Sequence, residues 1–164
     1  MEPTVKTQVY HESAAYAREH GELDQYRNSH WTNIACKNDI EDAIARNFDG
    51  MHLKKECVSE VLECYGAERT QFVLAATVQS KAWDGRFSRG NKEWAFNFEF
   101  ADTHQPGGFD RRDEYAVNSH PAVLDGFISL TRQEIRNREK SVHAQLQQTP
   151  IVAAKAAERR QSVP

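Results

Sequence analysis

The chain has 164 residues and a formal net charge of −3, a length typical of one domain and a charge that argues against a dedicated non-specific DNA binder. Its mean hydropathy of −0.76 is polar for a globular protein. The 16 aromatic residues (8 Phe, 5 Tyr and 3 Trp) and several periodic apolar segments nevertheless argue against disorder throughout the chain. Composition therefore predicts one folded domain and leaves its function open.

The first half of the chain is predicted to be helical. A short helix over residues 12–20 is ended by Gly21, and a longer one spans residues 23–47 with an apolar stripe that is unusually polar in its first half. Apolar residues spaced i, i+3, i+4 and i+7 then predict helices over residues 54–65 and 67–81, which Gly66 separates.

The second half mixes helix and strand patterns. Ser88 is placed to cap a short helix through residues 91–94. Phe96, Phe98 and Phe100 alternate with polar residues, which predicts a strand over residues 95–100. A polar loop over residues 102–113 and a return strand over residues 114–118 would complete a hairpin, and Pro121 fits the first turn of a last helix.

The expected fold is therefore α+β and mainly α, with four to five helices packed around a small antiparallel β-hairpin. Residues 1–138 would form a single globular domain with a net charge of −5. From Glu139 the apolar periodicity gives way to Gln, Ala and charged residues. Residues 139–164, with a net charge of +2, are therefore expected to be a frayed helical or disordered C-terminal tail.

Compartment signals favour a cytoplasmic protein. Cys36, Cys57 and Cys64 are odd in number and form no CxxC pair, so they predict neither a disulfide framework nor a cysteine-based zinc site. Residues 1–16 lack the apolar centre of a signal peptide. The longest apolar run, around residues 72–76, is far shorter than the roughly 20 residues that cross a bilayer. We expect a protein of a reducing cytosol that does not contact a membrane.

The residues best suited to bind a ligand are concentrated between the fourth helix and the predicted strand. Arg86, Arg89 and Lys92 could place three cations within a turn or two, and the flanking tryptophans could stack on a base. Two arginines before the return strand and Ser119-His120 at the start of the last helix could converge on the same anion. The candidate ligand-binding residues are Trp83, Asp84, Arg86, Arg89, Asn91, Lys92, Trp94, Arg111, Arg112, Ser119 and His120.

Each of these residues also has a purely structural interpretation. The tryptophans could be core anchors, the charges a solvated turn, and Ser119-His120-Pro121 an ordinary helix cap. No HxxxH or HExxH pattern indicates a metal site, and no GxSxG, GxGxxG or GxxxxGK[ST] motif indicates a hydrolase or nucleotide enzyme. We assign no catalytic residue, metal or cofactor, and the sequence favours a binding protein over an enzyme.

Five ordered blocks carry a resemblance to a known family. Their residues are 16–19 with 26–27 and 33–36; 47–53; 66–69 with 73–75 and 77–79; 83–86 with 91–95; and 119–121 with 124–126. Together they resemble an uncharacterised domain family of phage and conjugative-element proteins of Gram-positive gut bacteria, often a module of large polyvalent mobile-element proteins. The resemblance covers about residues 10–135 and implies an accessory protein of a mobile element in the cytoplasm of a bacterial host. It transfers no catalytic residue.

Three functions remain open on these grounds. The first is a binding protein that inhibits a host defence system, such as an anti-CRISPR-like inhibitor whose partner is a nuclease effector. The alternative is a nucleotide- or anion-binding protein, either a sponge for a signalling nucleotide or an enzyme acting on one. Direct nucleic-acid binding ranks third, because it needs a basic face within an acidic body.

Overall fold

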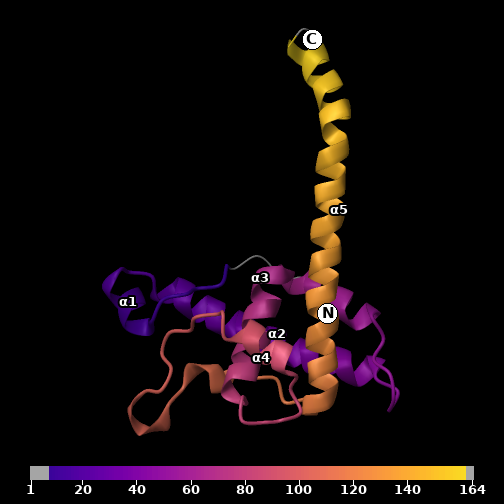
Figure 1. The fold of residues 1–164 in the computed structure, drawn as a ribbon. Helices are drawn as coiled ribbons and strands as arrows, with labels where there is room; N and C mark the ends of the chain where they lie inside the picture. The colour runs from indigo at the N-terminus through magenta and orange to yellow at the C-terminus, as the bar shows by residue number, and fades with distance from the viewer. Residues whose placement is uncertain (1–7, 162–164) are drawn as a thin grey trace. The chain divides into compact units, whose positions relative to one another are not determined.

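The computed structural model describes residues 8–161; residues 1–7 and 162–164, which belong to the expected domain and tail, lie outside that part. Within residues 8–161 there is no strand, and the one β-type pairing is an isolated bridge between Phe48 and Leu53. The elements, traced in Figure 1, are helices α1 (Ala14–Glu19), α2 (Leu23–Asn47), α3 (Glu56–Ser80), α4 (Arg89–Ala95) and α5 (Pro121–Gln161), with 3-10 helices η1 (Pro106–Gly108) and η2 (Arg111–Glu114).

The chain divides into two units, Met1–Thr131 and Arg132–Pro164. The core of the first unit is built on α2 and α3, and every residue from 72 to 78 is buried. Apolar side chains of α2 and of the first turns of α5 are also buried, among them Ile40, Leu124 and Phe127. Burying each such side chain is worth about 1.5–3 kcal/mol. No helix in the part of the chain that was described is both long and apolar enough to cross a membrane.

Several predicted elements match the structure closely. Helix α2 covers residues 23–47, as its apolar stripe predicts. Ser13 caps α1 by accepting a hydrogen bond from the Tyr16 backbone N–H at 3.0 Å, and Ser88 caps α4 in the same way. Pro121 is the first residue of α5, where its missing N–H costs no hydrogen bond.

Gly66 interrupts α3 without ending it. The sequence predicts two helices over residues 54–65 and 67–81, and the structure has one element whose halves meet at Gly66 with φ 82° and ψ 165°. This backbone conformation is essentially restricted to glycine. The predicted break is therefore a kink inside one helix.

The predicted β-hairpin is wrong, because residues 95–100 and 114–118 do not pair as strands. After α4 ends, the backbone N–H groups of Phe96, Asn97 and Phe98 donate back to carbonyls three or four residues earlier. Residues 96–98 therefore form turns that continue from α4. The three alternating phenylalanines also share no face, since Phe98 packs on Trp94 and Phe100 packs on Phe72.

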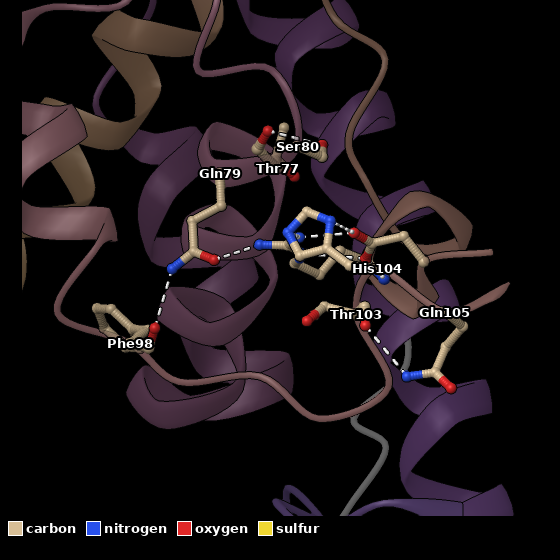
Figure 2. A network of polar contacts seen from close by, with 9 residues as sticks. Thr77, Gln79, Ser80, Phe98, Thr103, His104 and Gln105 are labelled. Carbon is tan, nitrogen blue, oxygen red and sulfur yellow. Dashed lines mark hydrogen bonds and ion pairs between the residues drawn. The ribbon is translucent and has the colours of Figure 1, made fainter. Parts of the chain in front are cut away.

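Polar side chains of α3 take the place of the missing strand partners. The Gln79 side-chain amide donates to the carbonyls of Ala95 at 2.8 Å and Phe98 at 2.9 Å, as Figure 2 shows for Phe98. The Thr77 hydroxyl accepts from the Val117 N–H at 2.9 Å, and the Lys81 ammonium donates to the Val117 carbonyl. Buried backbone groups need partners, and here α3 supplies them, so the fold is all-helical rather than α+β.

Candidate functional site

The first part of the predicted ligand site is an internally paired turn. Asp84 is buried, and its two carboxylate oxygens accept from Arg86 Nε at 3.0 Å and Nη2 at 2.9 Å. These hydrogen bonds lower the pKa of Asp84 to about 2. Because the Arg86 guanidinium donates to both Asp84 oxygens in a bidentate pair, its first role is to stabilise the conformation of this turn.

The neighbouring residues on α4 have structural partners as well. Arg89 pairs with Glu93 on the same exposed face at 3.1 Å. Asn91 is buried, and its amide donates to the Asp125 carboxylate at 2.8 Å and to Ser129 at 3.1 Å. Asn91 therefore joins α4 to α5. These contacts give Asn91 a structural role.

The two tryptophans of this segment differ. Trp94 is half-buried against Phe98, with ring centroids 5.0 Å apart, whereas Trp83 is 80% exposed. Lys92 is half-buried, and its charge helps to lower the pKa of Asp84 after the larger effect of Arg86. Trp83 is thus not a core anchor, and it is the most exposed aromatic side chain among those described.

The remaining predicted residues make contacts of their own. Arg112 is buried, donates to both Asp110 oxygens at 2.9 and 2.6 Å, and also reaches Gln79 and His104. Figure 2 shows His104 beside Gln79 in this network. At the start of α5, His120 Nδ1 accepts from the Ala122 N–H at 3.2 Å, so His120 contributes the side-chain contact of a helix cap, and the preceding Ser119 is half-buried.

Arg111 lies in a different environment, between two aromatic rings. Its guanidinium carbon is 5.4 Å from the centroid of Tyr26 on α2 and 4.9 Å from the centroid of Phe109. The guanidinium also donates to Glu114, which accepts from His30 Nε2 at 3.0 Å. His30 in turn lies 5.9 Å from the ring of Trp31. This chain of contacts joins α2 to η2.

We call this set the Arg111 surface: Tyr26, His30, Trp31, Phe109, Arg111 and Glu114. Trp31 is 65% exposed and Phe109 is 38% exposed, so solvent reaches both of its ends. Burial, and then the charge of Arg111, lowers the pKa of His30, which favours the neutral imidazole, and its Nε2 lies 3.0 Å from the Glu114 carboxylate. The surface therefore presents aromatic rings around the Arg111 guanidinium, whose charge Glu114 partly offsets.

The Arg111 surface is held from behind by polar groups of the first unit. Asp102, which has φ 59°, accepts from the Tyr26 hydroxyl at 3.2 Å and from the Ala14 N–H at 2.9 Å. Beside it, the buried Arg69 donates to the Ser29 carbonyl at 3.0 Å and to the Asn33 side chain. An adjoining cavity, which Tyr26, His30 and Arg111 help to line, has a volume of about 30 Å³.

Sequence reasoning included Arg111 but missed its neighbours. The usable signal was the unusually polar first half of the α2 stripe, where Tyr26 and His30 occupy positions i and i+4. Nothing in local spacing links that stripe to residues 109–114, some 80 positions later in the chain. Among the residues described, no group of three or more His, Cys, Asp or Glu side chains could hold a metal ion.

Comparison with known proteins returns one result for the domain. The family model described as "Protein of unknown function (DUF3849)" matches residues 9–136. This range contains every predicted site residue and the whole Arg111 surface. No curated protein and no solved structure matches the chain.

Proposed function

The chain belongs to the DUF3849 family, and for this member we propose that it acts by binding a partner protein through the Arg111 surface. The observation that carries the proposal is the continuous run of contacts from exposed Trp31, through His30 and Glu114, to Arg111 and exposed Phe109. Tryptophan, tyrosine and arginine are the residue types most enriched where protein interfaces carry their binding energy. Here one of each lies in a single cluster.

The cluster is also ordered before any partner arrives. Arg111 is fixed between Tyr26 and Phe109 and tied to Glu114, and Tyr26 is tied to Asp102. Ordering a flexible side chain at an interface costs about 0.5–1.5 kcal/mol. A surface whose arginine is already held avoids much of that cost, which favours affinity.

The cavities of the first unit favour a protein partner over an enclosed nucleotide. Drug-sized ligands occupy pockets of about 300–1,000 Å³, whereas the cavity behind the Arg111 surface measures about 30 Å³. A larger groove of about 680 Å³ is lined by four acidic side chains (Asp39, Asp42, Glu60 and Glu63) and a single cation, Arg46, so its lining is net acidic and disfavours phosphate. A third hollow of about 360 Å³ has an apolar lining apart from His120.

The nucleotide alternative is therefore the second candidate, and exposed Trp83 is the observation that favours it. A thermal-shift screen tests it directly, since ligand at 100 times its dissociation constant adds about 2.7 kcal/mol of stability. A stabilising nucleotide whose effect is lost in Arg86→Ala would support this function in place of protein binding.

We further propose that the partner is a host defence protein, such as a nuclease effector, which the chain inhibits on behalf of a mobile element. This part rests on the setting that the family resemblance implies. It is supported by the absence of catalytic motifs from the sequence. The family description itself assigns no function.

Capture of purified host nucleases tests both parts of the proposal. Immobilised wild-type protein should retain one nuclease from a broad panel and reduce its activity. Trp31→Ala should weaken the complex by 2 kcal/mol or more, about 30-fold. Trp83→Ala is the matched control, because it removes a tryptophan that is 80% exposed, compared with 65% for Trp31, from another part of the first unit. Equal weakening by both variants, or by Trp83→Ala alone, would rule out the Arg111 surface.

A further inference from the structure

The charge of the chain is divided more sharply than the division at residue 139 suggests. Residues 132–164 contain seven Lys or Arg and three Glu, and residues 1–131 contain 14 Lys or Arg and 21 Asp or Glu. The first unit therefore has a net charge of −7 and the second a net charge of +4. The two units that the contacts separate thus differ in the sign of their charge.

Three of these cations form a stripe along α5, and a histidine, which the net charge counts as neutral, continues it. Arg132, Arg136, Lys140 and His143 follow one another at i, i+4, i+8 and i+11, which places them on one side of an α-helix. Consecutive members are separated by about 6 Å or less along the helix axis. Apart from half-buried Arg132, these side chains are exposed. We call this set the basic stripe.

Neighbouring contacts keep the positive charges of the basic stripe together. Burial, and then the adjacent charge of Arg136, lowers the pKa of Arg132. Arg136 donates to the neutral amide oxygen of Gln133 at 2.8 Å, which leaves its charge in place. Glu134 pairs instead with Arg138 at 2.8 Å, about half a turn away from the stripe. Like charges four residues apart repel one another, so an anion on this side would be stabilising.

We propose that the basic stripe binds the phosphate backbone of duplex nucleic acid. Cations that recur at every turn of a helix can each meet a phosphate, and an α-helix fits the major groove of B-DNA, which is about 12 Å wide. Contacts of this kind position a protein without reading sequence. The activity is separate from partner binding through the Arg111 surface, because it uses residues of the other unit.

The other side of the same helix argues for nucleic acid rather than a lipid surface. Helices that lie in a membrane interface bury a broad apolar face with tryptophan, phenylalanine or leucine. Residues 132–164 contain no aromatic residue. Val142 and Leu146 are the exposed large apolar side chains described in this unit, and Glu139 lies between their side and the basic stripe.

Fluorescence anisotropy with a labelled random-sequence DNA duplex tests the proposal on the full chain. Binding should weaken linearly on a log–log plot against salt, with a slope of about −0.9 for each phosphate contact. The variant carrying Arg136→Gln and Lys140→Gln should lower the magnitude of that slope by about 1.8 and weaken binding about tenfold or more for each residue at low salt. Glu139→Gln should strengthen binding.

Arg138→Gln is the matched control, since it also removes one positive charge but from the side that Glu134 occupies. It should change duplex affinity much less than Arg136→Gln alone. Equal effects of these two substitutions would show that the basic stripe is not the binding site.

Vesicles containing phosphatidylserine form the second arm of the test. Binding to vesicles without binding to the duplex, or binding to neither at low salt, would overturn the proposal that the stripe binds nucleic acid. Far-ultraviolet circular dichroism confirms that each variant keeps its helix content.

Discussion

His30 lies where burial and a neighbouring cation both oppose its protonation, and these effects lower its pKa below the usual value near 6.5. The unfolded chain therefore binds a proton at this position more readily than the folded chain does. The contribution of His30 to stability is complete above about pH 6.5 and is lost as the pH falls toward the lower folded value. We expect urea midpoints to fall as the pH drops below about 6.5, and to fall less in His30→Gln.

The glutamine in that variant can still donate a hydrogen bond to Glu114 but cannot titrate. His143→Gln is the control, since this exposed histidine lies in the second unit, and it should leave the pH dependence of the first unit unchanged. Identical pH profiles for wild type and His30→Gln would show that burial of His30 has no energetic consequence.

At the same scale, the sequence reveals contacts that are close in the chain and hides those that are distant. The Asp84–Arg86 pair spans two residues, and a turn with acidic and basic members there can be anticipated. The Glu114–His30 and Arg111–Tyr26 contacts join positions more than 80 residues apart. Only the folded chain shows that Arg111 belongs with rings of α2 rather than with Arg86.

Among the elements, α3 carries the clearest local constraint at Gly66. Its φ of 82° and ψ of 165° lie in a region that other residues avoid. No atom within 4 Å would meet an added Cβ, so the cost of Gly66→Ala is conformational. We expect a loss of about 1–3 kcal/mol in the free energy of unfolding, measured with urea. Gly90→Ala, at an open helical position of α4, should instead be neutral or gain up to about 1 kcal/mol.

The contacts between α3 and residues 95–118 explain why the predicted hairpin is wrong. An aromatic alternation predicts a strand only if a partner strand satisfies the backbone, and here Thr77, Gln79 and Lys81 do so instead. Side-chain to backbone bonds of this kind leave no periodic pattern in the sequence. Helices, whose hydrogen bonds are local, could be predicted; this segment, whose partners come from elsewhere, could not.

Thr77→Val tests that explanation, because valine keeps the volume of threonine but cannot accept the Val117 N–H. Leaving this buried donor without its partner should cost about 1–3 kcal/mol. Thr131→Val is a close control: Thr131 is also buried and its hydroxyl also donates to a carbonyl four residues earlier. We expect it to cost much less. Similar urea midpoints for the two variants would mean that the Val117 contact contributes little.

At the scale of the whole molecule, the chain separates an acidic unit with a packed core from a basic helical unit. No side chain described between residues 132 and 146 is buried. The core residues for which burial is described all lie before residue 132, and so does the Arg111 surface. The mild net charge of −3 is therefore the sum of two opposite charges that suit different partners, and each unit can be tested without the other.

A chain that ends at Asn137 makes that test. It keeps the first unit with residues 132–137 of α5 and loses Lys140 and His143 from the basic stripe. Because every side chain described between residues 138 and 146 is exposed, we expect one cooperative urea transition with a midpoint close to that of the full chain. The slope should change little, since it follows the surface exposed on unfolding. The shortened chain should retain its protein partner and lose most of its affinity for duplex DNA.

Loss of the cooperative transition would show that the folding of the first unit depends on the second. Loss of partner binding with folding intact would place the partner on α5 instead of on the Arg111 surface.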